Sequence, residues 1–421
     1  MKKIFLILVL VFFPIKSFAL FPKFDSDKLG IDSTKIMRYK NEYGDFNIPF
    51  KANPNLDTLK YYMFKYNRDP ESKPNQRTIK PSQKPYEFNS ELKKFKFLNK
   101  EFSKKGIVSY LYYEKDKIII DEISPKDRLG ELVNNKTKLR SNSMGKSLVS
   151  YILGHAICEG YIKSVDSSIS DWPLMKNSLY ENHKLIDLLN MASGDQEYVN
   201  DSFLLKNGNR SRDGIGVDGM SAKFLGMLFQ KKTAGKKTYN YNQNNPNLIL
   251  NYVLFKSKGS FQEILDKTFK EKAKIKNSVL FYKKGDPEEH GNADSMFYAS
   301  RYDWLRIAKA VMDDYQNDTC VGKYLKEIYN RKIPKGANEF EEEPGFNKTY
   351  SYGGQFHLDY PGIKNKVVFG MGGRGGQAVL IDMEDSRIIV INSIHYNKDR
   401  YKYNVKKLLI NPIKKGEEAF K

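Results

Sequence analysis

The chain of 421 residues is poor in the side chains that bind transition metals or build the commonest catalytic triads. It has two cysteines and five histidines, and these are scattered along its length. A zinc-type site needs several such ligands at short spacing, which the sequence does not provide. A Gly-x-Ser-x-Gly segment is also missing, so a Ser-His-Asp triad on a nucleophile elbow is disfavoured. The composition therefore predicts no metal site.

Apolar runs long enough to cross a membrane are missing as well. Lys2 and Lys3 precede an apolar run from Ile4 to Phe13, and Ser17-Phe18-Ala19 follows as a small-residue cleavage site. A membrane-spanning helix needs about 20 apolar residues, which this run lacks. The first 19 residues are therefore predicted to be a secretory signal peptide, which leaves a periplasmic or secreted chain without a membrane span. An uncleaved anchor is the alternative.

Export would change the chemistry of Cys158 and Cys320. An oxidising compartment would allow these two cysteines to form a disulfide. Pairing requires their Cα atoms to lie within about 7 Å of each other. The sequence leaves that distance open.

The chain has fewer acidic than basic residues. The chain has 71 Lys and Arg against 50 Asp and Glu, a formal charge of +21. The predicted signal peptide holds three lysines and no acid, so the mature charge is 21 − 3 = +18. A charge of this size can attract polyanions. Because the lysines are spread along the whole chain, they indicate a solvated surface, and nucleic acid is not a predicted partner.

The stretch that stands out is Ser143-Met-Gly-Lys146, at the start of a long apolar segment. Residues three apart on a helix share a face, so the Lys146 ammonium can reach the Ser143 hydroxyl. A serine becomes a nucleophile when a base takes its proton, and a lysine can be that base or can hold another base ionised. Gly145 would leave room for a substrate near the backbone. The segment from Leu148 to Ile162 is typical of a buried helix.

The tetrad alone does not establish catalysis. Ser90-Glu-Leu-Lys93 has the same spacing in a polar, lysine-rich context, where we expect a helix capped by Ser90. A capping serine followed by a surface lysine is the corresponding alternative for Ser143.

The rest of the chain divides into an arm and a main body. Residues 20–86 are rich in proline, lysine and aromatic residues, which predicts an extended arm packed on the body, with a short helix near residues 56–66. Residues 87–421 would form one domain. It would contain a hairpin at residues 106–124, strands at residues 351–358, 366–369, 377–382 and 387–392, and a final helix near Leu408. Two further helices are expected at residues 184–194, ending on Gly194, and from the capping box of Ser300 to Val311.

Four segments occur in the order of a known set of motifs. They are Ser143-Met-Gly-Lys-Ser147, Leu188-Leu-Asn-Met-Ala-Ser-Gly194, Ala299-Ser-Arg-Tyr-Asp-Trp304 and Gly372-Gly-Arg-Gly-Gly-Gln377. Together they resemble the serine hydrolases related to class C β-lactamases and penicillin-binding proteins, in particular the 6-aminohexanoate-dimer hydrolase (nylon-oligomer hydrolase) branch. The match covers about residues 104–411. It implies an α+β fold of the β-lactamase/transpeptidase type, an antiparallel sheet flanked by helices, with a helical lobe inserted at about residues 150–295.

The resemblance also implies a catalytic tyrosine followed two residues later by a polar residue. Tyr241 lies seven residues before Leu248, as in the family pattern, which makes Gln243 the polar partner. Tyr239 is the alternative. A phenol has an unperturbed pKa near 10, and a neighbouring lysine cation would favour its phenolate as the base for Ser143. The competing interpretation is an aromatic core residue at a helix start.

The third motif departs from the family. Where β-lactamases carry Lys-Thr-Gly, this chain has Gly370-Met371-Gly372 or Met371-Gly372-Gly373. The cation that binds a β-lactam carboxylate is therefore missing, although Arg374 could supply a charge, and Gln377 ends the segment as a further substrate-binding candidate. By resemblance, the N–H groups of Ser143 and Gly373 would form the oxyanion hole. A phosphate loop is the rival interpretation, but no Gly-Lys-Ser/Thr ending is present.

The sequence thus predicts an exported serine hydrolase of an amide, ester or peptide, acting through an acyl-enzyme on Ser143, with Lys146 and Tyr241 as the base pair. No metal or organic cofactor is required. Two rivals remain: a non-catalytic protein on the same fold that binds a peptide or wall fragment, and a basic surface-binding protein that acts through its arm. Substrate identity and oligomeric state stay open.

Overall fold

The structure is a computed structural model that describes Leu56, Leu59 and residues 76–195, 234–284, 292–336, 345–395 and 400–421. The predicted signal peptide, most of the predicted arm and the loop at residues 196–233 lie outside these ranges. Within the described residues, no helix combines the length and apolar character that crossing a membrane requires.

A large sheet joins the two ends of the main body. Among the described residues it has nine strands, antiparallel except for the first pair. Leu111 near the start of the body lies opposite Val390 near its end, so distant segments meet in one sheet, as the sequence predicts. In spatial order the strands are β2 (Asn89–Ser90), β4 (Lys117–Ile123), β3 (Ile107–Glu114), β13 (Arg387–Ser393), β12 (Gln377–Asp382), β11 (Val368–Gly373), β10 (Phe356–Leu358), β9 (Ser351–Gly353) and β8 (Ile333–Pro334).

The central strands are apolar on both faces because both faces are covered. Alternate residues of a strand point to opposite sides of a sheet. In β13, Ile388 and Val390 belong to one hydrophobic cluster, and Ile389 and Ile391 belong to another. A strand buried on both sides reads as a continuous apolar run, as this one does.

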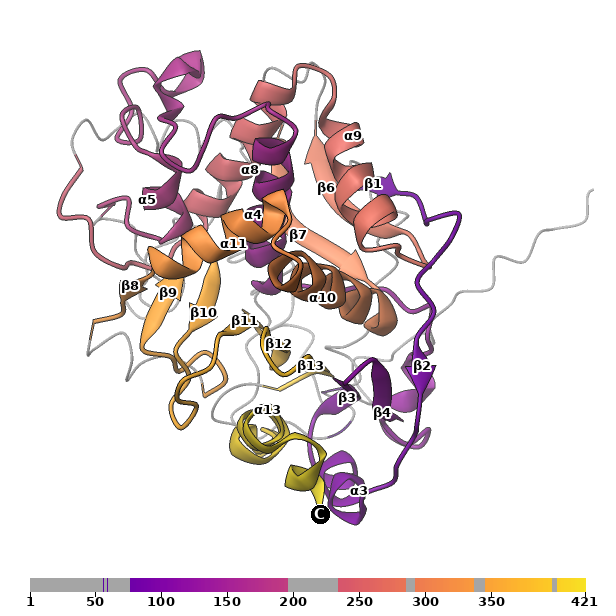
Figure 1. Cartoon of the computed structure of the whole chain (residues 1–421). Coiled ribbons are helices and arrows are strands. Elements are labelled where there is room, and N and C mark those ends of the chain that lie inside the picture. The colour runs from indigo at the N-terminus through magenta and orange to yellow at the C-terminus, as the bar shows by residue number, and fades with distance from the viewer. Residues whose placement is uncertain are drawn as a thin grey trace, which may run out of the picture.

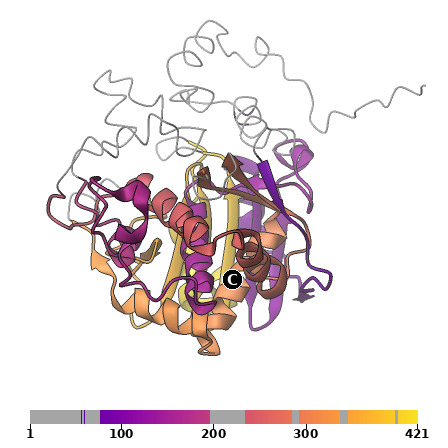
Figure 2. The ribbon, with the colours of Figure 1, turned by 90° about the horizontal axis from the view of Figure 1, so that it is seen from above.

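Helices form a layer on each face of the sheet (Figure 1). One layer contains α4 (Met144–Cys158), α10 (Arg301–Gln316) and α11 (Cys320–Asn330), with α4 and α10 against the central strands. Seen from above, these helices lie over the strands (Figure 2). The other layer contains α3 (Lys96–Lys104) and α13 (Asn411–Lys415), with helical turns on either side of α13 at Lys406–Ile410 and Gly416–Phe420. The predicted C-terminal helix is thus present in several short pieces.

A second, smaller sheet, which the sequence does not predict, joins strands of the inserted lobe to two strands that precede the lobe in the chain. Its strands, in spatial order, are β1 (Gln76–Ile79), β6 (Val279–Lys284), β7 (Asn292–Ala299) and β5 (Leu139–Arg140). Strand β7 packs against α4 and against α8 (Asn244–Ser257), which is followed by α9 (Phe261–Leu265) and a π-helical turn. The last residues of the predicted arm therefore enter the body as strand β1.

Three local predictions are wrong, two of them because a tertiary contact decides the outcome. Ser90 lies in β2, paired with β4 beside Ile118, and the helix that it was expected to cap begins only at Lys96. The helix predicted up to Gly194 is α5 (Leu185–Leu189). It stops there because the Asn190 side chain donates to the Arg331 carbonyl and accepts from the Gly354 N–H.

The third concerns residues 351–358, which form the hairpin β9–β10 instead of one strand. Gly354 and Gln355 form its turn with φ angles of 59° and 65°. Two successive positive φ angles are those of a tight type I′ turn. By contrast, Ser300 caps α10 as predicted: Ser300 Oγ accepts from the Asp303 N–H at 3.2 Å, and α10 extends to Gln316.

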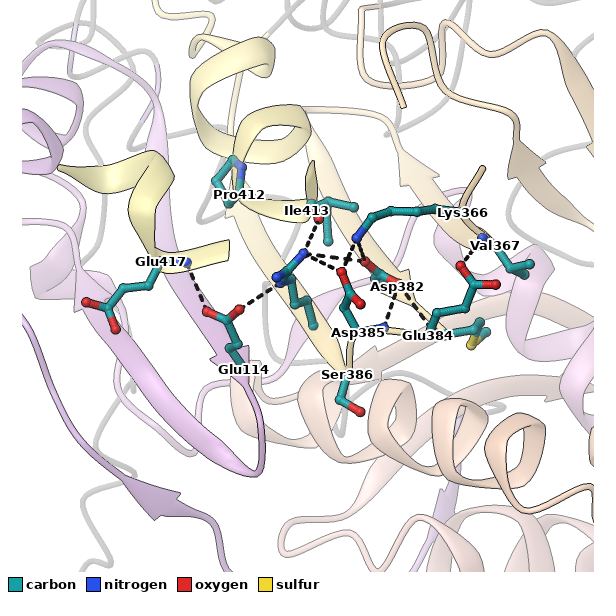
Figure 3. Close-up of polar contacts among 12 residues, drawn as sticks. Glu114, Lys366, Val367, Asp382, Glu384, Asp385, Ser386, Pro412, Ile413 and Glu417 are labelled. Carbon is teal, nitrogen blue, oxygen red and sulfur yellow. Dashed lines mark hydrogen bonds and ion pairs between the residues drawn. The ribbon is translucent and has the colours of Figure 1, made fainter. Parts of the chain in front are cut away.

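An ion-pair network binds the C-terminal helices to the sheet (Figure 3). Arg387 of β13 donates to Glu114 of β3 at 2.7 Å and to the Ile413 carbonyl at 2.9 Å. Glu114 also accepts from the Glu417 N–H at 2.9 Å, and a second pair joins Lys366 to the fully buried Asp382. Buried charges are tolerated when they are paired and hydrogen-bonded, so this network serves the fold.

A disulfide joins Cys158 at the end of α4 to Cys320 at the start of α11, with Cα atoms 5.8 Å apart. The pairing that the sequence left open therefore occurs. It fixes two helices of the same layer across a separation of 162 residues.

The disulfide should stabilise the protein mainly by restricting the unfolded chain. Replacing Cys158→Ser together with Cys320→Ser should lower the free energy of unfolding by about 3 kcal/mol, measured by urea denaturation. Wild-type protein in reductant should show the same loss. Equal stability of oxidised and reduced protein would contradict the prediction.

A second prediction concerns His155, which α4 buries against the ring of Tyr151. Burial lowers the pKa of His155 from 6.5 to about 4. The unfolded state then binds a proton that the folded state excludes, so this contribution to stability is complete above about pH 6.5 and is lost as the pH falls toward 4. Between pH 7 and pH 4, wild type should lose about 3 kcal/mol more unfolding free energy than His155→Phe. Equal losses in urea titrations at the two pH values would refute this.

Candidate active site

Ser143 stands at the N-terminus of α4, but its side chain does not cap the helix. Instead the Ser143 hydroxyl accepts a hydrogen bond of 3.2 Å from the Lys146 Nζ. Ser143 is half-buried, and Lys146 is buried with 4% of its surface exposed. The alternative of a capping serine with a surface lysine is therefore wrong for this tetrad.

The turn before the serine is held in an uncommon conformation. Asn142 has a φ of 47°, in the left-handed region that residues other than glycine seldom adopt. Its side-chain amide donates to the Arg374 carbonyl at 2.7 Å. Such strain persists only where surrounding contacts enforce it, and it is common at functional sites. The bond ties the serine turn to the end of β11.

Gly145 has a different role from the one expected. A Cβ atom at this position would lie 1.8 Å from the Ser295 carbonyl oxygen of β7 and 2.8 Å from Ser141 Oγ. The missing side chain thus allows the first turn of α4 to pack on the small sheet. The expectation that Gly145 makes room for a substrate is wrong.

Lys146 also contacts the predicted second motif. Its Nζ donates to Gln243 Oε1 at 2.5 Å. The Gln243 amide nitrogen in turn donates to Ser295 Oγ at 2.6 Å, and Asn247 Oδ1 lies 3.4 Å from it. Because both ends of the amide are engaged, its oxygen is directed at the ammonium. Gln243 immediately precedes α8, so the start of that helix and strand β7 together position Lys146.

Of the two candidate tyrosines, Tyr241 is the one beside Lys146. The ammonium lies 4.9 Å from the centre of the Tyr241 ring, a cation–π distance. Tyr239 is buried at 5% exposure, and its ring centre lies 5.2 Å from that of Tyr352, in a cluster that includes Met191. The geometry thus gives Tyr239 a packing role and brings Ser143, Lys146, Tyr241 and Gln243 together.

The end of β11 lies against the serine turn. Gly373 pairs with Gln377 of β12, and a Cβ atom on Gly373 would lie 2.5 Å from the Ser141 carbonyl oxygen and 3.3 Å from the Asn142 Cβ. Only a residue without a side chain permits this close approach. The structure therefore brings Gly373 next to the turn that carries Ser143.

The other two residues predicted for substrate binding lie differently. Gln377 is buried, donates its amide to the Ser393 carbonyl and accepts from Asn392 at 3.3 Å. Its polar groups therefore hold β12 to β13, and we assign it a structural role instead of substrate binding. The Arg374 side chain is exposed, in the turn after β11.

The sequence reasoning missed a second lysine near the site. Lys335, just after β8, places its Nζ 3.0 Å from His357 Nδ1 and donates to the Asn347 carbonyl at 2.9 Å. Both side chains are buried, at 7% and 3% exposure. Burial, followed by the charges of Lys335 and Lys146, holds the pKa of His357 well below its usual range. A polar residue within an otherwise apolar strand pattern, Phe356-His357-Leu358, was the available signal.

Within the described residues, no three His, Cys, Asp or Glu side chains gather in a way that could hold a metal ion.

Comparisons with known proteins identify the fold. No family model and no curated protein sequence matches the chain. Among solved structures, one described as a "Putative 6-aminohexanoate-dimer hydrolase from Bacillus anthracis" has a TM-score of 0.58 at 16% identity, covering 82% of this chain and 92% of that one. "EstCE1, a hydrolase with promiscuous acyltransferase activity" has a TM-score of 0.51 at 13% identity, covering 75% and 99%. A class C β-lactamase in complex with cefoxitin has a TM-score of 0.48 at 12% identity, covering 71% and 91%.

The protein therefore has the β-lactamase/transpeptidase-like fold, as the motifs predict, with a large sheet between two helical layers. At these identities the likeness concerns the fold, and the activity has to be argued from the site itself.

Proposed function

We propose that the protein is a serine hydrolase that cleaves an amide or ester bond through an acyl-enzyme on Ser143. The observation that carries this proposal is the contact between the Lys146 ammonium and a Ser143 hydroxyl that caps no helix. A buried cation directed at a half-buried hydroxyl is an arrangement suited to an activated serine.

The first chemical step is acylation. The Ser143 hydroxyl loses its proton to the pair formed by Tyr241 and Lys146 and attacks the substrate carbonyl carbon. The proton then passes to the leaving amine or alcohol as the carbon–nitrogen or carbon–oxygen bond breaks, which leaves an ester on Ser143. The Lys146 cation beside the Tyr241 ring favours the phenolate that this step requires.

The second step is hydrolysis of that ester. Water gives a proton to the same pair and attacks the acyl carbon, and Ser143 regains its proton as the acid product leaves. In both steps negative charge develops on the carbonyl oxygen. The backbone N–H groups of Ser143 and Gly373 are the proposed donors to it, because close packing of Gly373 on the serine turn brings the two residues together.

The substrate class follows from what the third motif lacks. Gly370, Met371 and Gly372 offer no cation in β11 for the carboxylate of a β-lactam. We therefore propose an ordinary amide, ester or short peptide as the substrate. Two proteins of similar fold, described as a 6-aminohexanoate-dimer hydrolase and a hydrolase with acyltransferase activity, agree with this class.

We also propose that the protein is exported. Residues 1–19 have the pattern of a signal peptide. The disulfide between Cys158 and Cys320 supports this location, because such bonds persist mainly in oxidising compartments.

A binding protein on the same fold is the second candidate. Gln243 in the position of the usual asparagine and the missing Lys-Thr-Gly motif are the features that favour it. Such a protein would keep the fold without an activated serine, so labelling of the serine separates the two candidates.

Exposure to a fluorophosphonate should give the wild-type protein one covalent adduct, seen by intact mass. Ser143→Ala should form none, whereas Ser90→Ala, in the tetrad of the same spacing on β2, should be labelled like wild type. Lys146→Met should slow labelling by about a thousandfold. A folded wild-type protein that takes no adduct would contradict catalysis and favour the binding protein.

The role of Gln243 can be tested separately. Gln243→Leu removes an oxygen 2.5 Å from the Lys146 ammonium, so we expect labelling to slow by about tenfold to a hundredfold through misplacement of the lysine. Gln262→Leu, at an exposed position on α9, is the matched control and should leave the rate unchanged. An unchanged rate in Gln243→Leu would remove this residue from the site.

A further inference from the structure

The place of the missing third-motif cation is adjacent to a buried histidine. Gly370 of β11, where the motif begins in one of the two alignments, lies directly opposite His357 of β10. His357 is therefore one strand away from the position at which the related enzymes carry lysine. Its ring nitrogen Nδ1 contacts the Lys335 ammonium at 3.0 Å.

Lys335 is held firmly in this position. It donates to the Asn347 carbonyl at 2.9 Å, and its ammonium lies 5.4 Å and 5.8 Å from the ring centres of Tyr239 and Tyr352. Aromatic faces and a carbonyl oxygen stabilise a buried cation. The lysine is thus a fixed charge, with 7% of its surface exposed.

His357 connects this charge to the proposed base. Its ring is nearly parallel to that of Tyr241, at an angle of 26° with centres 6.5 Å apart. Because Lys335 donates to Nδ1, the neutral imidazole carries its proton on Nε2. The pKa of His357 is lowered by burial and then by Lys335 and Lys146, so the ring is neutral.

Among the described residues, charged and titratable groups from three elements face Tyr241. Lys146 of α4 lies over its ring, His357 of β10 stacks on it, and Tyr352 of β9 meets it edge-on with centres 6.2 Å apart. Lys335 and Tyr239 lie behind this layer, next to His357 and Tyr352. In the part of the chain that the structure describes, the phenol thus has one cation over its ring and a second one bonded to the stacked histidine.

We propose that Lys335, acting through His357, is a second cationic positioning group of the active site, which takes the place of the missing third-motif lysine and favours the phenolate of Tyr241. The inference rests on the proposed function, since it assigns these residues to the same base. Neither residue is a catalytic residue here, because each acts through Tyr241.

The physical consequence is a dependence of serine activation on pH. A positive charge near a phenol stabilises the phenolate, so loss of that charge moves ionisation of the phenol to higher pH. Activation would then need a more alkaline solution, while the rate at high pH would change little. A residue that only supports the fold would alter the rate equally at every pH.

The test is the rate of fluorophosphonate labelling of full-length protein between pH 5 and pH 10. In Lys335→Met the midpoint of the rise in rate should move up by about one pH unit, with about a tenfold lower rate at pH 7. Lys335→Arg should restore the wild-type midpoint. Lys332→Met is the matched control. Lys332 lies three residues before Lys335 and pairs with Asp359, so its loss should leave the midpoint unchanged.

Lys335→Gln is a second variant, included in case Lys335→Met does not fold. It keeps a hydrogen-bond donor for His357 but removes the positive charge. If it is folded and its midpoint rises, the inference is supported. An unchanged midpoint in a labelled, folded Lys335→Gln or Lys335→Met, or a uniform loss at every pH, would overturn this inference and leave the proposed function standing. If wild type itself is not labelled, the proposed function fails, and this inference fails with it.

Discussion

The ammonium group of Lys146 holds the site together. It donates to Ser143 on its own helix, donates to Gln243 at the start of α8 and lies over the ring of Tyr241. A lysine is expensive to bury unless its hydrogen bonds are satisfied, so these contacts also allow it to stay inside the protein. The Lys146 ammonium would therefore activate the serine and also hold the surrounding segments in place.

The rest of the fold explains why this contact can form. Gly145 lets α4 approach β7, which brings Ser295 to the Gln243 amide and so directs the amide oxygen at the lysine. On the other side, Gly373 lets β11 reach the serine turn. Ser143 thus lies between the two sheets, one of which positions the proposed activating groups while the other brings up Gly373, the proposed second donor to the oxyanion.

The sequence predicts best those features that involve residues close together in the chain. The contact between Ser143 and Lys146 follows from helical spacing alone, and the helix cap at Ser300 and the hairpin β3–β4 are equally local. The fold class and the choice of Tyr241 came from a set of motifs that resemble a family. Strands β12 and β13 were found because runs of buried aliphatic residues are typical of a sheet covered on both faces.

The predictions from sequence fail where contacts with a distant segment of the chain determine the local structure or the role of a residue. The role of Gly145 depends on β7, which lies about 150 residues later, and the Gln377 amide is hydrogen-bonded to β13. Helix α5 ends early because Asn190 bonds to two remote loops. Lys335 and His357 belong to no motif, and they come together beside Tyr241 through the pairing of β8 with β9, of β9 with β10 and of β10 with β11.

The central claim, an activated Ser143 that forms an acyl-enzyme, is tested most directly by rapid mixing with p-nitrophenyl acetate. The account predicts a burst of one nitrophenol per chain, accompanied by an acetyl group that peptide mass mapping places on Ser143. Nitrophenol release without a burst, or an acetyl group on another residue, would contradict it.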